Sequence, residues 1–174
     1  LNALLKIIEE PTKNNYFILI NNESKKLLDT IKSRSLEMKI ILTPEEKRKI
    51  SDHLTNYFKQ KIYLDFKLMN ISPGNYIRFN YFFLENKINI NDKYLLNLKL
   101  ILEYFKKEKD IFYKDLILFY TDYYLYKIYT PKIKDNINLI YYRSVIFKKI
   151  NEFFIYNLNQ NTLLNSLEGK LFNE

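Results

Sequence analysis

Few side chains in this sequence could carry catalytic or metal chemistry. The 174 residues include no cysteine and a single histidine, His53. Without thiolates the chain cannot build a thiolate zinc site, an iron–sulfur cluster or a cysteine nucleophile, and no second imidazole is available to complete a transition-metal site. The sequence therefore predicts no metal site, and we expect His53 to lie at the surface or at its boundary.

Two further motifs favour structural roles over catalytic ones. Glu9 and Glu10 are adjacent, so on a helix their carboxylates point about 100° apart and do not converge on one substrate. Glycine occurs only at Gly74 and Gly169, which leaves no glycine-rich loop to cradle a nucleotide phosphate. We therefore expect no active site in this chain and no cofactor bound by it.

A run rich in tyrosine could either stack nucleic-acid bases or fill a core. Its aromatic residues are Phe119, Tyr120, Tyr123, Tyr124, Tyr126 and Tyr129. Their i, i+3, i+4 spacing places most of the rings on one side of a helix, which favours a core stripe over a stacking surface.

The charge of the chain gives only weak support to nucleic-acid binding. The formal net charge is +8, but the basic residues are spread along the whole sequence and nearly all are lysine. A dedicated phosphate-binding surface usually concentrates its charge on one element. We therefore do not expect direct, sequence-specific DNA binding.

The location of the protein is indicated by what the sequence lacks. No apolar run approaches the roughly 18 residues of a membrane span. The absence of cysteine fits a reducing compartment, and the segment opens at Leu1 without a leader or a methionine. We expect a soluble, cytoplasmic protein without membrane contacts, and a segment that begins inside a longer reading frame.

The segment 1–42 has the alternating pattern of an α/β domain. The apolar spacing of residues 1–10 predicts the end of an amphipathic helix. The continuous apolar run 16–20 predicts a buried strand, 24–30 a short helix, and 37–42 a second strand. This order indicates the last part of an α/β domain with parallel strands.

The segment 43–88 predicts a unit of three helices. The hydroxyl of Thr43, a following proline and a glutamate form a capping box that opens a helix over 44–60. A shorter helix is expected over 63–69, and a second serine–proline pair opens a helix over 73–85.

The segment 89–174 predicts a helical bundle. Segments with helical spacing lie near 92–108, 110–129, 135–157 and 160–172. Candidate N-caps are Asp110, Asp135 and Asn159. In the third helix, steps of seven, three and four predict an inward stripe of Ile140, Phe147, Ile150, Phe154 and Leu158. Taken together, the fold class is mainly α, after two short strands of a truncated α/β domain.

Three stretches near the start of the chain resemble the clamp-loader branch of the AAA+ ATPases. They lie at 2–11, 16–22 and 27–35. That branch has a stretch like NALLKTLEEPP, a strand that ends in a sensor residue, and a motif like LLPTIRSRC. Its members continue with a three-helix lid and a helical collar, which is the order of elements expected here. The resemblance therefore implies the end of an AAA+ domain at 1–42, a lid at 43–88 and an oligomerising collar at 89–174.

The resemblance also implies roles for individual residues. Asn21 matches the sensor-1 position, where a polar side chain faces the terminal phosphate of a nucleotide. Ser33, Arg34 and Ser35 match the family's Ser-Arg-Cys motif, whose arginine acts in trans on the ATP–Mg of a neighbouring subunit. A planar, always charged guanidinium suits this role because it can contact γ-phosphate oxygens bidentately. Ser35 replaces the usual cysteine and Asp29 the usual proline, while the arginine itself is retained. The alternative interpretation of Arg34 is an ordinary surface arginine that ends a short helix.

Departures from the family pattern indicate a subtype. Gly74 stands where ATP-hydrolysing subunits place a sensor-2 arginine, and a Ser-Pro-Gly there resembles the delta-prime subunits of bacterial DNA polymerase III. This implies a non-catalytic clamp-loader subunit of a DNA-directed DNA polymerase, a nucleotidyltransferase holoenzyme that acts in DNA replication. The implied partners are the gamma/tau ATPase subunits and the delta subunit, and, through the assembly, the sliding clamp and primed DNA.

Two alternatives stay open at this point. The first is an ATP-hydrolysing gamma/tau clamp-loader subunit. The second comes from another class: a stand-alone basic helical domain that binds nucleic acid without sequence preference, with the motif accidental.

Overall fold

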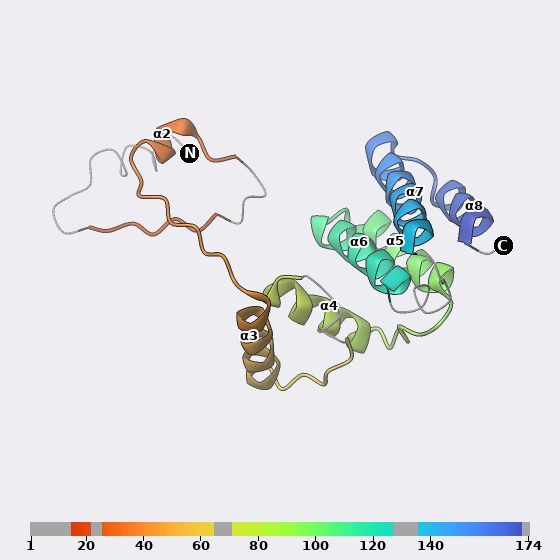
Figure 1. The fold of residues 1–174 in the computed structure, drawn as a ribbon, viewed down its shortest axis with the longest axis horizontal. Coiled ribbons are helices and arrows are strands. Elements are labelled where there is room, and N and C mark those ends of the chain that lie inside the picture. Colours follow the sequence, from red (N-terminus) through yellow and green to blue (C-terminus); the bar gives the residue numbers. More distant parts are fainter. Residues whose placement is uncertain (1–14, 22–25, 65–70, 127–135, 172–174) are drawn as a thin grey trace. The chain divides into compact units, whose positions relative to one another are not determined.

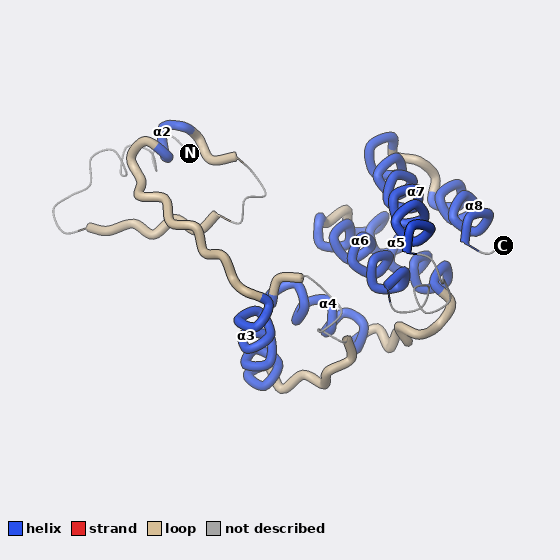
Figure 2. Tube along the Cα trace, viewed as in Figure 1, coloured by secondary structure: helices blue, strands red, loops and turns tan. Residues whose placement is uncertain are grey.

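The computed structural model describes residues 15–21, 26–64, 71–126 and 136–171 (Figure 1). The chain divides into two compact units, Leu1–Leu42 and Thr43–Glu174. We call them the N-terminal unit and the helical unit, and each is described by itself. Throughout the described ranges every regular element is a helix, so the protein is mainly α (Figure 2).

The regular structure described in the N-terminal unit is one short helix, α2 (Asp29–Lys32). Leu28 precedes it without a side-chain cap, and none of its four residues is buried. The helix expected over 24–30 is thus displaced toward the C-terminus, since residues 26–28 are not helical. The helix expected over 1–10 lies outside the described residues.

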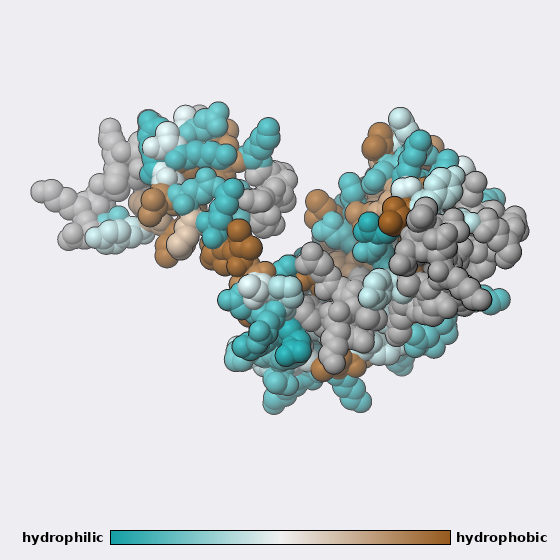
Figure 3. Space-filling view, in the orientation of Figure 1, coloured by the Kyte–Doolittle hydropathy of each residue, from teal (hydrophilic) through white to brown (hydrophobic). Residues whose placement is uncertain are grey.

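The two strands predicted for this unit are not formed. Residues 16–20 and 37–42 are loop (Figure 2). A strand needs a neighbouring backbone for its ladder, and a continuous apolar strand needs cover on both faces; the described residues of this unit supply neither. Large apolar side chains therefore stay at least 80% exposed at Tyr16, Ile18, Ile20, Leu36, Met38, Ile40 and Ile41, and Figure 3 shows hydrophobic side chains at the surface of this unit.

The helical unit begins at the predicted capping box. Helix α3 (Pro44–Tyr57) opens with the Thr43 Oγ1 accepting the amide N–H of Glu46 at 3.3 Å, while the Thr43 N–H donates to the Glu46 carboxylate at 2.8 Å. That backbone hydrogen bond, together with one from the Thr43 hydroxyl, lowers the pKa of Glu46. The start of the helix is where the sequence predicts it, because the cap is purely local.

Residues 60–64, which follow α3, are hydrogen-bonded to α4 (Pro73–Glu85). The Asn80 side chain, fully buried, accepts the N–H groups of Tyr63 and Leu64 at 2.8 and 3.2 Å and donates to the Lys61 carbonyl at 2.8 Å. The shorter helix expected over 63–69 does not include Tyr63 or Leu64, and the rest of it lies outside the described residues.

Four further helices complete the described part of the helical unit. They are α5 (Tyr94–Glu108), α6 (Ile111–Tyr124), α7 (Asn136–Tyr156) and α8 (Gln160–Leu171). The predicted N-cap Asp110 accepts the N–H of Phe112 at 2.8 Å, and Asn159 accepts that of Asn161 at 2.9 Å; Asp135 lies outside the described residues. Helix α5 packs against α6 and α8, and α7 packs against α6 and α8.

One hydrophobic core runs through the helical unit, from Leu64 to Leu167. Helix α4 joins it through aromatic contacts with α6: the Phe79 ring lies 4.8 Å from that of Phe119, and the Phe83 ring lies 5.7 Å from that of Tyr120. The helices expected to form lid and collar therefore share buried side chains.

The tyrosine-rich run fills this core, as its spacing predicts. Phe119, Tyr120, Tyr123 and Tyr124 are buried and Tyr126 is half-exposed, while Tyr129 lies outside the described residues. Buried hydroxyls find partners inside: the Tyr94 and Thr121 hydroxyls are 2.9 Å apart, and the Asn97 amide donates to the Tyr120 hydroxyl at 3.1 Å. Within the described parts of the chain no buried polar side-chain atom lacks a partner.

The inward face of α7 differs from the predicted one. Ile150 is buried and Phe147 and Phe154 are partly buried, but Ile140 is 70% exposed and Leu158 is 39% exposed. Phe147 and Phe154 pack against the core as predicted, and Ile146 and Phe153, which the predicted stripe does not include, are buried beside Ile150. At 100° per residue Ile140 lies about 80° around the helix from Ile150, and Leu158 follows the end of α7 at Tyr156, where helical spacing no longer sets its direction.

Candidate functional site

The Ser33, Arg34 and Ser35 motif lies at the C-terminal end of α2. The Arg34 Nη1 donates to the Thr30 carbonyl at 3.0 Å and approaches the Ser33 Oγ at 3.4 Å. The Ser33 hydroxyl donates to the same Thr30 carbonyl at 3.1 Å, and the Ser35 hydroxyl donates to the Ile31 carbonyl at 2.7 Å. The two serine hydroxyls thus bond back to the preceding turn, and the end of the arginine side chain is bonded to the same turn.

Arg34 is exposed at this helix end, as are Ser33 and Ser35. Basic groups near a helix C-terminus complement its negative end, but four residues of helix supply little of that field. Short-range hydrogen bonds thus direct the guanidinium back to the last turn of α2, while the residue as a whole stays exposed to solvent.

Asn21, the residue at the predicted sensor-1 position, lies in a separate exposed loop segment. The strand that would end at Asn21 is not formed, so its position is not fixed by a sheet. The structure brings Ser33, Arg34 and Ser35 together, whereas Asn21 comes from a different stretch of the N-terminal unit.

The absence of a metal site is predicted from the sequence alone. His53 is exposed on α3, and the described residues contain no group of three or more histidine, cysteine or acidic side chains able to hold a metal ion. Likewise, no helix in the described ranges is long and apolar enough to cross a membrane.

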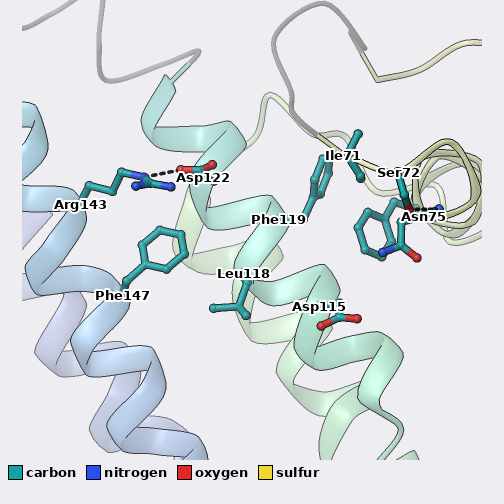
Figure 4. A pocket seen from close by; sticks show the side chains of 10 residues that line it. Ile71, Ser72, Asn75, Asp115, Leu118, Phe119, Asp122, Arg143 and Phe147 are labelled. Atoms are coloured by element: carbon teal, nitrogen blue, oxygen red, sulfur yellow. Dashed lines mark hydrogen bonds and ion pairs between the residues drawn. The ribbon is translucent and has the colours of Figure 1, made fainter. Parts of the chain in front are cut away.

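A groove of about 540 Å³ opens between α4, α6 and α7 of the helical unit (Figure 4). Its apolar floor includes Phe79, Phe119 and Phe147, and its polar rim includes Asp115 and the ion pair of Asp122 with Arg143. The Arg143 Nε donates to the Asp122 carboxylate at 2.7 Å, which raises the pKa of Arg143.

The groove lacks the constellation that chemistry needs. Its guanidinium is paired with Asp122 and lies 5.0 Å from the centre of the Phe147 ring, its one hydroxyl, that of Ser72, accepts the N–H of Asn75 as the cap of α4, and no histidine lines the cavity to act as a base. Sequence reasoning missed this groove because its lining comes from three helices, and no local motif announces residues that only packing brings together.

Gly74, the residue at the predicted sensor-2 position, is the second residue of α4. A Cβ added there would meet no atom within 4 Å, and its backbone is not left-handed. Packing among the described residues therefore does not require glycine at this position.

Comparison with known proteins places similarity at the start of the chain. Residues 1–43 match the family described as "DNA polymerase III, delta subunit". This stretch includes Asn21, Arg34 and the whole of α2. A relation to that family is supported over these residues.

A particular relative matches over a shorter stretch. The DNA polymerase III subunit delta' of Buchnera aphidicola subsp. Baizongia pistaciae is 53% identical over 36 residues, which cover 21% of this chain and 11% of that protein. The chain thus matches only a small part of its curated relative's length. No solved structure matches the chain.

Proposed function

We propose that this chain is part of a delta-prime-like clamp-loader subunit of DNA polymerase III, and that Arg34 acts in trans on ATP–Mg bound by a neighbouring subunit. The observation that carries the proposal is the family match over residues 1–43, which contains the Ser33, Arg34 and Ser35 motif. The exposure of the guanidinium at the end of α2 is compatible with a role outside its own unit.

In this proposal the chain binds no nucleotide and catalyses nothing by itself. Its partners are the gamma/tau ATPase subunits and the delta subunit, and through them the sliding clamp and primed DNA in the cytoplasm. Residues 43–88 act as the lid and 89–174 as the collar through which the subunits associate. Asn21 takes the sensor-1 position once a sheet fixes its loop.

The role of Arg34 rests on the difference between a guanidinium and an ammonium. During phosphoryl transfer, negative charge develops on the equatorial oxygens of the transferred group. A planar guanidinium can contact two of these oxygens at once, whereas an ammonium acts as a point charge. Arg34→Lys should therefore rescue activity poorly even though it keeps the charge.

The test replaces Arg34 in the reconstituted clamp loader and follows single-turnover ATP hydrolysis at the site that faces it. Arg34→Ala should slow hydrolysis there by about 10³-fold or more while assembly is unchanged. Lys32→Ala is the matched control, because it removes a cation from the same exposed helix. Normal hydrolysis at that site in the Arg34→Ala complex would refute the trans-acting role.

Two further experiments, a change in the phosphate loop and an assembly assay, separate the proposal from its alternatives. A gamma/tau-type subunit would lose its own ATP binding when its phosphate loop is changed, whereas a delta-prime-like subunit would not depend on one. A stand-alone nucleic-acid-binding domain would neither assemble with clamp-loader subunits nor alter their ATP hydrolysis.

A further inference from the structure

The end of α3 and the loop after it expose aromatic and aliphatic side chains. Tyr57 is 73%, Phe58 56% and Ile62 67% exposed. The Tyr57 and Phe58 rings contact each other edge to face, with centroids 5.1 Å apart and planes at 87°. The helical unit thus leaves two large rings in solvent although it has a core that buries many others.

Two lysines alternate with these apolar residues. Lys59 and Lys61 are exposed, and neither forms an ion pair with a described carboxylate. The acidic residues of the first turn of α3, Glu45 and Glu46, lie at the other end of the helix, roughly 18 Å away at 1.5 Å per residue. We call Tyr57, Phe58, Lys59, Lys61 and Ile62 the α3-end surface.

Hydrogen bonds from buried side chains hold the backbone of this surface in place. Besides its bonds to Tyr63, Leu64 and the Lys61 carbonyl, the buried Asn80 amide donates to the Gln60 Oε1 at 3.2 Å. The Tyr76 hydroxyl adds a bond to the Leu64 carbonyl at 3.0 Å. A ligand that binds here therefore pays little to order the loop that carries Lys61.

We propose that the α3-end surface binds single-stranded nucleic acid. Exposed rings stack on unpaired bases whatever the sequence, and lysines interleaved with them contact the phosphates between successive bases. A protein partner is less favoured, since lysine is depleted in protein–protein interfaces. The surface lies in the helical unit and is independent of the role proposed for Arg34.

The test measures binding of the 174-residue chain to a labelled oligothymidine of about 20 nucleotides by fluorescence anisotropy. Tyr57→Ala and Phe58→Ala should each weaken binding by about five- to tenfold, the lower part of the range for loss of one stacking ring. Replacing Lys59 and Lys61 with alanine should reduce the slope of log affinity against log salt by about 1.4, or 0.7 per phosphate contact on a single strand.

Matched controls use the same residue types elsewhere in the helical unit. Tyr141→Ala removes a ring that is 62% exposed on α7, and the pair Lys106→Ala and Lys107→Ala removes two exposed cations at the end of α5. Both controls should bind the oligonucleotide like the original chain. Circular dichroism of each variant verifies that the helices remain.

Several results would overturn the proposal. One is unchanged affinity in folded Tyr57→Ala and Phe58→Ala variants. Another is equal weakening of binding by the Lys59/Lys61 and Lys106/Lys107 replacements, which would indicate general electrostatic attraction by a chain of net charge +8. Binding of duplex DNA as tightly as of the single strand would exclude stacking on unpaired bases, and an absence of measurable binding at about 50 mM salt would exclude the site altogether.

Discussion

Sequence similarity and packing are distributed oppositely between the two units of this protein. The N-terminal unit carries the match to DNA polymerase III delta-type subunits, yet its described helix buries no residue. The helical unit lies almost wholly beyond that match, yet it holds the continuous core. The difference shows that sequence similarity does not follow packing: the motif proposed to act on a partner lies in the segment that packs least.

The two units also differ in how they treat apolar side chains. Ile18 is 89% exposed in the N-terminal unit, while Phe79 is 1% exposed in the helical unit. Similar residues thus contribute very different amounts to stability, since the hydrophobic contribution follows the area removed from water.

The largest expected effect tests this contrast in packing. Phe79→Ala should lower the free energy of unfolding of the helical unit by about 4 kcal/mol, because it removes a buried ring and leaves a cavity against Phe112 and Phe119. Urea denaturation followed by circular dichroism measures the change. Ile18→Ala is the counterpart in the N-terminal unit and should change the free energy of unfolding by less than about 0.5 kcal/mol. A similar loss of stability in the two variants would contradict the comparison.

An intermediate effect concerns the buried tyrosines of the helical unit at high pH. Burial raises the pKa of Tyr94 and Tyr120 above the usual value, and burial with a hydrogen bond to Glu108 raises the pKa of Tyr113 to about 12. A tyrosine is neutral when protonated, so above a pH of about 10 the unfolded chain loses protons first and stability falls.

The stabilisation is therefore complete below pH 10 and lost as the pH rises toward the folded-state pKa values, by about 1.4 kcal/mol per pH unit for each such tyrosine. Urea unfolding at pH 9 to 12 measures this slope. Tyr120→Phe should reduce the slope of stability against pH, while Tyr16→Phe in the N-terminal unit should leave that slope unchanged. An unchanged slope in Tyr120→Phe would show that this hydroxyl does not limit alkaline stability.

The smallest expected effect concerns the way the helical unit ends its helices. Lys109 caps α5 in the left-handed region at φ 54°, where a side chain costs energy that glycine avoids. Lys109→Gly should raise the free energy of unfolding by roughly 1 kcal/mol. Lys99→Gly, at an exposed position in the body of the same helix, should lower it by about the same amount; equal signs for the two variants would refute the conformational explanation.

How much the sequence determines depends on how local each signal is. The starts of α3, α4 and α6 are predictable because each cap joins residues at most three positions apart, as at Thr43, Ser72 and Asp110. The tyrosine-rich run is predictable as core because its spacing already places the rings on one face. The resemblance to clamp-loader subunits likewise rests on contiguous motifs.

The tertiary structure alone decides features that join distant positions. The strands over 16–20 and 37–42 depend on backbone partners that their own residues cannot supply, and the inward face of α7 depends on which helices it meets. The Asn80 bonds to residues 16 to 20 positions earlier and the pairing of Asp122 with Arg143 arise only when packing brings the chain together. A sequence specifies such contacts through the whole free energy of folding rather than through any local pattern.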